Sequence, residues 1–462
     1  MAEGFDDFMS DADALMWAIE SDPLLRSTIV TALLLDRAPS WESVVEKLER
    51  GVRLIPRMRQ RVVEPAFGFG TPAWSDDPFF DLSYHARRVR NPDPSNDRIV
   101  YELASTAATE AFDRDRPLWE YTLVEGLPGG RAAFVMKVHH SMTDGVGGIK
   151  LLLMLLDLER EPPAPGPEPD PLPLAVFSPW AVAIHRLAVQ RAMVRNAAAR
   201  AIPAAFSAAD EVRRNAVGIV GTGAKMAASA ARFLAPAPTP ASPLLRQRSL
   251  GRQVEAFDVP LDDLKRAAKG LGVSLNDVFV GAVLGGMHRY HEDHNTEARE
   301  LRMIMPINVR SDGGGLGGNH FTPARVMVPT HTQTPANRIE EVSARCRRLR
   351  AEPAVGMTEQ LATVLNLLPR RAATALMGSM FKGADLVTSN VPGAPFPLYL
   401  GGAEIERIYA FGPLSGTSTN VTLLSHSGLC CIGVNVDTAA VPDADRLVGD
   451  LRASFGEVLA LG

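Results

Sequence analysis

Two proline-rich stretches divide the chain into three parts. They cover residues 161–179 and 236–243, the second reading PAPTPASP. Proline fixes φ and lacks a backbone N–H, so such stretches favour extended linkers. The ranges 1–160 and 246–462 both alternate β-branched apolar runs with helix-like periodicity. We therefore expect an α/β protein in which two units, 1–160 and 246–462, are joined by a linker at 161–245.

The expected elements follow from these periodicities. In the first unit, strands are predicted at residues 27–35, 119–124 and 132–139, with helices at 43–51, 97–112 and 148–156. In the second unit, strands are predicted at residues 252–259, 301–305, 325–328, 385–389 and 429–436, with a helix at 274–290. The linker is rich in alanine and arginine and is helical in propensity.

Composition excludes several classes of protein. The net charge of -5 and pI of about 6.1 argue against a nucleic-acid partner. The three cysteines form no CxxC or Cys/His spacing, which argues against a structural metal and favours a reducing compartment. The acidic N-terminus lacks the features of a signal peptide, and no apolar run approaches the roughly 20 residues of a membrane span. We expect a cytoplasmic protein that meets membranes only peripherally.

The densest group of reactive side chains is the string HHSMTDG at residues 139–145. His139 and His140 lie at the end of a predicted strand, where successive side chains point to opposite faces. They are therefore poor joint ligands for a metal, and only one of them can face a cleft. An imidazole titrates near pH 6.5 and can accept a proton at neutral pH. Gly145 permits a tight backbone close to a substrate.

A plain alternative exists for this string. Both histidines could simply end a strand, with Asp144 as the cap of the next helix. An isolated pair of histidines would favour that interpretation. The complete HHxxxDG pattern at a strand-to-helix turn favours a chemical site. Because no GxSxG elbow or P-loop accompanies it, we expect no covalent nucleophile, and direct transfer between two bound substrates.

A second polar group opens the helix predicted at 274–290. Ser274 and Asp277 have the spacing of a capping box. Asn276, between them, is either a plain helical residue or an amide that faces a substrate and supports a tetrahedral intermediate. Trp119 is expected to pack in the core and not to contact substrate.

The string HHSMTDG resembles the active-site motif of the coenzyme A-dependent acyltransferase superfamily. Other strings resemble the bacterial wax ester synthase/diacylglycerol acyltransferase family in kind and in order, over nearly the whole chain. They are PLW at 117–119, ND at 276–277, PINVR at 306–310, GN at 318–319 and NVPG at 390–393. The resemblance implies two chloramphenicol-acetyltransferase-like domains, each a mixed β-sheet flanked by helices, joined by a helical linker. A tunnel would run between them.

The resemblance also implies roles for residues. In the superfamily the second histidine is the general base, which maps to His140, and the aspartate, here Asp144, pairs with an arginine. The string MRQRV at 58–62 makes Arg59 the candidate partner. Arg310 would either bind the phosphates of coenzyme A or form an ion pair. His139, Gly145 and Asp277 would support the site.

The expected reaction moves a long acyl chain from acyl-CoA, a co-substrate, to a lipid hydroxyl, with no bound cofactor. The acceptor would be diacylglycerol, giving triacylglycerol, or a long-chain alcohol, giving a wax ester. One alternative keeps the fold but acylates a polyketide, sugar or amine. Another is a non-catalytic lipid-binding protein of lipid droplets, which would need no base in its binding site.

The linker carries a further expectation. Between residues 185 and 232 its basic side chains are interleaved with apolar ones, which suits an anionic membrane or lipid-droplet surface. The arginines are Arg186, Arg191, Arg195, Arg200, Arg213, Arg214 and Arg232. The alternative is a solvated helical bridge between the two units.

Overall fold

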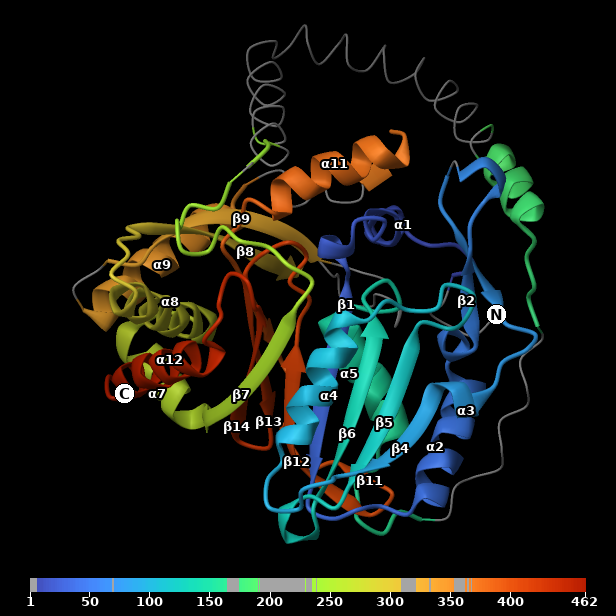
Figure 1. The fold of residues 1–462 in the computed structure, drawn as a ribbon, viewed down its shortest axis with the longest axis horizontal. Coiled ribbons are helices and arrows are strands. Elements are labelled where there is room, and N and C mark those ends of the chain that lie inside the picture. The colour runs from blue at the N-terminus through green and yellow to red at the C-terminus, as the bar shows by residue number, and fades with distance from the viewer. Residues whose placement is uncertain are drawn as a thin grey trace, which may run out of the picture.

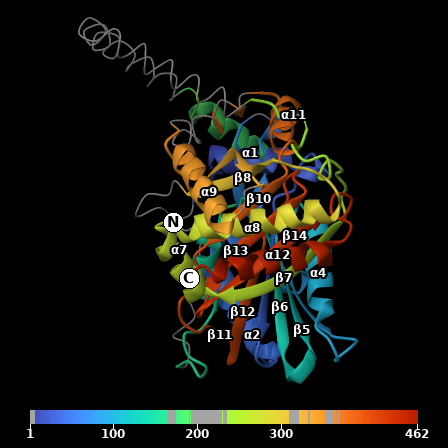
Figure 2. The ribbon, with the colours of Figure 1, turned by 90° about the vertical axis from the view of Figure 1, so that its left-hand side faces the viewer.

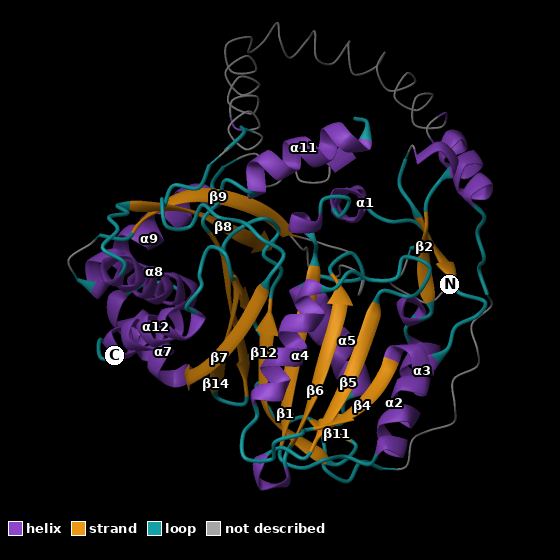
Figure 3. Ribbon diagram, in the orientation of Figure 1, coloured by secondary structure: helices purple, strands orange, loops and turns teal. Residues whose placement is uncertain are grey.

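The computed structural model describes residues 6–163 except residue 69, and then 174–189, 239–308, 321–331, 334–352 and 368–462, with a few isolated positions between these ranges. Two six-stranded sheets stand side by side, flanked by helices (Figures 1 and 3). This agrees with the expected pair of sheet-and-helix units. Most of the linker, including the arginines from Arg195 to Arg232, lies outside the described residues.

The first sheet has the strand order β11-β12-β1-β6-β5-β4. All its pairs are antiparallel except β4 with β5. Its strands are β1 (Thr28–Leu35), β4 (Ala86–Arg90), β5 (Trp119–Glu125), β6 (Ala132–His139), β11 (Tyr399–Leu400) and β12 (Ala403–Phe411). A separate hairpin joins β2 (Gln60–Val63) to β3 (Ala73–Asp76).

The second sheet has the order β7-β14-β13-β10-β8-β9 and is mixed, because β10 pairs in parallel with both β13 and β8. Its strands are β7 (Arg252–Pro260), β8 (Glu300–Asn308), β9 (Phe321–Pro329), β10 (Leu386–Val391), β13 (Thr419–His426) and β14 (Leu429–Asp437). Its core is continuous with the helices behind it, where the rings of Phe257 on β7 and Phe455 meet edge to face at 5.3 Å.

The helices cover the outer faces of the sheets and close their upper end. In Figure 2, α8 and α12 cross in front of the second sheet, while α1 and α11 pack together above the space between the sheets in Figure 1. The helices are α1 (Asp11–Ile19), α2 (Trp41–Leu54), α3 (Leu82–His85), α4 (Arg98–Thr109), α5 (Gly145–Leu155), α7 (Leu261–Leu271), α8 (Leu275–Asp293), α9 (Pro335–Arg350), α11 (Arg370–Phe381) and α12 (Ala444–Leu459). Single 3₁₀ turns lie at Pro23–Leu25, Pro56–Met58, Ala66–Gly68 and Pro128–Gly130.

The chain crosses between the sheets near its C-terminal end. Strand β12 follows β10 along the sequence, yet it pairs with β1 of the first sheet from Val30↔Phe411 to Leu35↔Ile405. The chain then returns to the second sheet for β13 and β14. The first sheet is therefore completed by strands from both sides of the linker, whereas the six strands of the second sheet all follow it. The division at 161–245 remains a prediction about the sequence.

Every predicted strand is present, and the predicted helices start or end a few residues away from the expected limits. The helix expected at 148–156 begins earlier, at Gly145, because Asp144 supplies its cap. The capping box of Ser274 and Asp277 is confirmed at the start of α8. Among the described residues, no single helix has the length and apolarity to cross a bilayer. Helices α7 and α8 have that length and apolarity only when taken together, and the chain bends by 101° between them.

Candidate active site

His139 and His140 lie where β6 ends, between its neighbours β1 and β5. The His140 N–H donates to the carbonyl of Ser27, 2.8 Å away, so the residue just before β1 holds the backbone just after β6. Seven of the eight β6 residues are buried and only Val138 is partly exposed, which fixes the register of the strand. The pair of histidines is therefore presented by a rigid element.

The two imidazoles occupy different environments. His139 is fully buried, and its Nδ1 accepts a hydrogen bond from the Ser141 N–H at 3.0 Å. Its Nε2 lies 2.9 Å from Oε1 of Glu20. His140 is only partly buried and lines a large cavity together with Thr143 and Asp144. The alternation along β6 thus places His140, and not His139, at the cavity wall.

The cavity has a volume of about 300 Å³ and lies between the two sheets. Helices α1, α5 and α11 and strands from both sheets contribute to its wall, which is mainly apolar. Its apolar lining includes Leu15, Ile19, Ile29, Met136, Val138, Ile149, Leu152, Ile304, Met377, Phe381, Val387, Val391 and Leu424. A wall of this kind suits a hydrocarbon chain, and a few polar side chains, His140 among them, interrupt it.

Asp144 and Gly145 form the turn into α5. The Asp144 side chain accepts from the Gly147 N–H at 2.8 Å and is 6% exposed. A Cβ on Gly145 would lie 2.9 Å from Cγ2 of Val391, so only glycine lets α5 approach β10 this closely. Both residues line the cavity. The helix-capping interpretation of Asp144 is therefore correct, and it coexists with a place in the site.

Asn276 does not line the cavity itself but contacts a residue that does. Its Oδ1 accepts, at 3.5 Å, from Nδ2 of Asn390, which does line the cavity. Asp277 is buried, and its carboxylate accepts from the Ser274 N–H and from the Ser343 hydroxyl of α9. Asp277 therefore joins α8 to α9. A role for Asn276 near the reacting atoms remains a prediction.

The roles expected of two arginines remain predictions. Arg59 Nε lies 3.0 Å from Oδ1 of Asp76, which is an ion pair with the hairpin strand β3. Its pairing with Asp144 remains a prediction. Arg310 lies outside the described residues, so its proposed contact with phosphate is not placed.

Several site residues were not singled out from the sequence. Asn390 and Ser389 on β10, with Asn420 and Thr422 on the neighbouring β13, give the cavity its polar groups opposite His140's sheet. Asn390 lies in the NVPG string, so a signal existed for it. Asn420 and Thr422 lie on a strand that we did not predict, and no local pattern marked them.

Known proteins match this chain along its length. A model of the wax ester synthase/diacylglycerol acyltransferase catalytic domain matches residues 9–279, and a model of the family's C-terminal domain matches residues 317–458. The chain belongs to the wax ester synthase/diacylglycerol acyltransferase family. It is therefore an acyltransferase, as the HHxxxDG pattern indicated.

Relatives and solved structures agree with this family. A Mycobacterium tuberculosis protein, provisionally named a diacylglycerol O-acyltransferase, is 38% identical over 98% of this chain and 92% of its own length. The wax ester synthase/diacylglycerol acyltransferase of Marinobacter aquaeolei superposes with a TM-score of 0.65 at 20% identity, covering 98% of both chains. A condensation domain of the calcium-dependent antibiotic synthetase gives 0.62 at 16% identity, over 98% of this chain and 95% of its own. These two structures confirm the fold.

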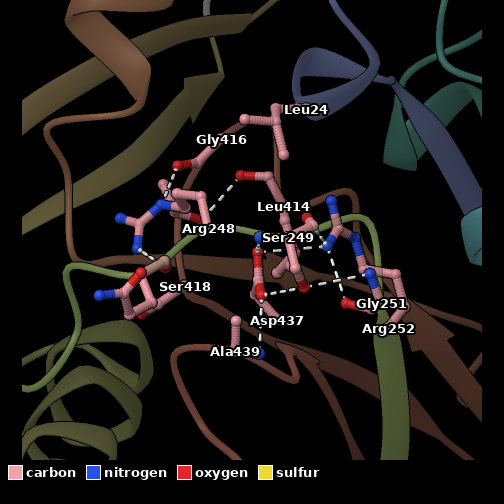
Figure 4. Close-up of polar contacts among 12 residues, drawn as sticks. Leu24, Arg248, Ser249, Gly251, Arg252, Leu414, Gly416, Ser418, Asp437 and Ala439 are labelled. Atoms are coloured by element: carbon pink, nitrogen blue, oxygen red, sulfur yellow. Dashed lines mark hydrogen bonds and ion pairs between the residues drawn. The ribbon is translucent and has the colours of Figure 1, made fainter.

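The loop that joins β12 to β13 forms part of the cavity wall. Pro413 and Ser415 of this loop line the cavity. Figure 4 shows Arg248 beneath it, donating to the carbonyl of Gly416; Arg248 also donates to the carbonyl of Ala384 at 2.9 Å. Burial lowers the pKa of the Arg248 guanidinium. Arg248 therefore has a structural role, because its guanidinium joins the backbone carbonyls of Gly416 and Ala384.

Thiols and metal ligands give no other reactive centre in the described part of the chain. Burial raises the pKa of Cys346 and Cys431 to about 11 and that of Cys430 to about 12, which keeps all three protonated and unreactive at neutral pH. Within the same residues, no group of three or more His, Cys, Asp or Glu side chains could hold a metal ion.

The two roles of Asp144 can be separated by substitution. An asparagine keeps an oxygen that can cap α5 but removes the charge, whereas an alanine removes both. We expect Asp144→Ala to be less stable than Asp144→Asn by about 0.5–2 kcal/mol, the usual contribution of such a cap. Thermal and urea unfolding of both variants measure this difference. Equal stability of the two would show that the cap contributes nothing.

Proposed function

We propose that this acyltransferase moves a long-chain acyl group from acyl-CoA to the hydroxyl of diacylglycerol or of a long-chain alcohol, with His140 as the general base. The observation that carries the proposal is the position of His140 in the wall of an apolar cavity that both sheets build. Two hydrophobic substrates can meet there away from water. The names of the family and of its relatives support a lipid acceptor.

The chemistry needs one base and a place for developing charge. His140 takes the proton of the acceptor hydroxyl as its oxygen attacks the thioester carbonyl. The tetrahedral intermediate then collapses, an ester forms, and the sulfur of coenzyme A leaves with the proton that His140 returns. Most of the rate gain comes from holding hydroxyl and thioester together at the base.

An amide group in the wall of the cavity that His140 lines supports this scheme. Asn390 lines the cavity and contacts Asn276, so a donor amide backed by a second amide lies on the β10 side. A fixed donor that meets the negative oxygen of the intermediate contributes about 3–4 kcal/mol in a dry site. We propose that Asn390, backed by Asn276, has this role.

A thiol-release assay tests the function. Purified protein is mixed with palmitoyl-CoA and, in separate arms, dioleoylglycerol, hexadecanol or no acceptor. We expect free thiol to appear faster with an acceptor, together with triacylglycerol or wax ester by thin-layer chromatography. Thiol release without an ester product would indicate a hydrolase, and no release in any arm would indicate a binding protein.

The length of the acyl chain should depend on Gly148 of α5. This residue lines the cavity, and a Cβ there would meet only Thr143 Cγ2, at 3.5 Å. A leucine side chain therefore has room to enter the cavity and displace part of the substrate chain. Each buried methylene contributes about 0.8 kcal/mol, so excluding two or more should cost a long substrate about tenfold or more.

The measurement compares Gly148→Leu with wild type on palmitoyl-CoA and octanoyl-CoA. We expect kcat/KM for palmitoyl-CoA to fall about tenfold relative to that for octanoyl-CoA. Gly449→Leu is the matched control, because Gly449 also lies in a helix but a Cβ there meets nothing within 4 Å. An unchanged ratio in Gly148→Leu would remove this part of the cavity from the acyl-binding path.

We also propose that the linker region contacts an anionic lipid surface. Its described part, the helical residues 179–189, exposes Trp180, Ile184 and Leu187, and the exposed ring of Phe67 packs edge to face on Trp180. Tryptophan and leucine beside arginine suit the membrane interface. Co-sedimentation should be stronger with anionic than with neutral liposomes and should weaken with salt. Equal weak binding to both would contradict the proposal.

A further inference from the structure

Glu20 reaches the catalytic strand from the end of α1, where it is the C-cap residue. A single carboxylate oxygen makes two contacts. Oε1 accepts from the Ser27 N–H at 2.8 Å, and it lies 2.9 Å from Nε2 of His139. The contact with Nε2 is close enough for a hydrogen bond but lacks the N–H direction of one, so it is mainly electrostatic.

Both contacts lead to the backbone of His140. The Ser27 carbonyl accepts a hydrogen bond from the His140 N–H at 2.8 Å. Ser27 therefore links Glu20, through its N–H, to His140, through its carbonyl. His139 precedes His140 in the chain, so the two share a peptide bond. The Nδ1 atom of His139 accepts a hydrogen bond from the Ser141 N–H at 3.0 Å. Fixing the His139 ring and Ser27 therefore fixes the peptide from which the His140 ring projects.

The surroundings select one form of His139. Because Nδ1 accepts a hydrogen bond from the Ser141 N–H, the neutral ring carries its own proton on Nε2, on the side of Glu20. The ring is fully buried and is contacted edge to face by Trp17 and Phe112, at 5.7 and 5.9 Å. These contacts leave the imidazole no room to turn without losing its polar partners.

The carboxylate of Glu20 is kept ionised. Burial by itself would raise its pKa, but the neighbouring His139, the Ser27 N–H and the charge of Arg114 outweigh burial, and the pKa lies below its usual value of 4.5. A charged acceptor makes stronger and shorter hydrogen bonds than a neutral one. At neutral pH the Ser27 N–H therefore donates to a charged oxygen, and the same charge lies beside His139 Nε2.

We infer that Glu20 is a positioning residue, which acts through His139 and Ser27 to aim the His140 imidazole into the cavity. This inference rests on the proposed role of His140 as the base. It assigns a function to the first histidine of the motif as well: His139 transmits the position set by Glu20. Displacement of a catalytic group by about 1 Å can cost about 10² in rate, so the effect should be kinetic.

The test compares Glu20→Ala with Glu20→Gln. Glutamine keeps an oxygen that can accept from both Ser27 and His139, whereas alanine keeps none. We expect kcat to fall about 10–100-fold in Glu20→Ala, with KM for palmitoyl-CoA and for the acceptor within about twofold of wild type. Glu20→Gln should recover kcat to within a few-fold. If kcat is unchanged in Glu20→Ala, or if only KM rises, the inference is wrong.

Loss of folding is separated by a matched control. Glu64 accepts from Nε1 of Trp17 and pairs with Arg370, so it supports the same region without touching either histidine. All rates are measured well below each melting temperature. Glu64→Ala should lower the melting temperature and leave kcat near wild type. An equal loss of kcat in Glu64→Ala and Glu20→Ala would reduce Glu20 to general structural support and overturn the inference.

A double substitution separates this inference from the proposed base. In a His140→Ala background nothing remains to be aimed, so adding Glu20→Ala should cause no further loss of kcat. An additional 10–100-fold loss would contradict positioning. Near-normal turnover in His140→Ala alone would instead contradict the proposed base, whatever Glu20 does.

Discussion

Replacing His140 with alanine is expected to lower turnover about 10²–10⁴-fold, the usual contribution of a general base. The partly exposed imidazole lines the cavity in which we propose that the acceptor hydroxyl meets the thioester. The affinity for acyl-CoA should change little, because in the proposed complex the apolar wall residues of α1, α5 and α11 would make most of the contacts with the acyl chain. Single-turnover rates and equilibrium binding of palmitoyl-CoA measure the two effects separately.

His139→Ala is the companion experiment under the same conditions. Its ring is buried and does not line the cavity, so its loss should reduce stability and reduce kcat less than His140→Ala does. If His139→Ala were inactive and His140→Ala kept near-normal turnover, His139 and not His140 would be the general base. Two active variants would contradict base catalysis by this motif altogether.

Replacing Trp119 with alanine is expected to destabilise the protein by about 3–5 kcal/mol, the usual cost of removing a fully buried aromatic ring. Trp119 on β5 has no exposed surface, stacks on His85 at 4.6 Å and donates from Nε1 to the carbonyl of Met58 at 2.7 Å. The alanine leaves a cavity and an unpaired carbonyl. Thermal unfolding should show a large fall in melting temperature.

Two further variants separate the contribution of the Trp119 ring from that of its Nε1 donor and from the effect of removing an exposed tryptophan. Trp119→Phe keeps most of the ring and removes only the donor, so we expect a loss of about 1–2 kcal/mol. Trp180→Ala is the matched control, because that ring is 61% exposed and its loss should change stability by less than about 0.5 kcal/mol. A Trp119→Ala protein as stable as Trp180→Ala would show that the core repacks around the gap.

Local patterns in the sequence determined the individual elements and the chemistry. A strand whose side chains alternate faces can present only one of two adjacent histidines to a cleft, and His140 is the one at the cavity wall. The spacing of Ser274 and Asp277 was enough to predict the capping box, because its hydrogen bonds join residues three apart. The ordered strings from residue 117 to residue 393 were enough to indicate the family.

Contacts between distant residues were decided by the tertiary structure. Strand β12 joins the first sheet through pairs such as Val30↔Phe411, and no local pattern states which strand edge it will choose. Glu20 and His139 are 119 positions apart (139 − 20) and meet only because α1 and the end of β6 pack together. The sequence by itself therefore determined the motif, its elements and the family. Only folding brought Glu20 beside His139 and Asn390 to the cavity that His140 lines, since the packing of whole sheets fixes such neighbours.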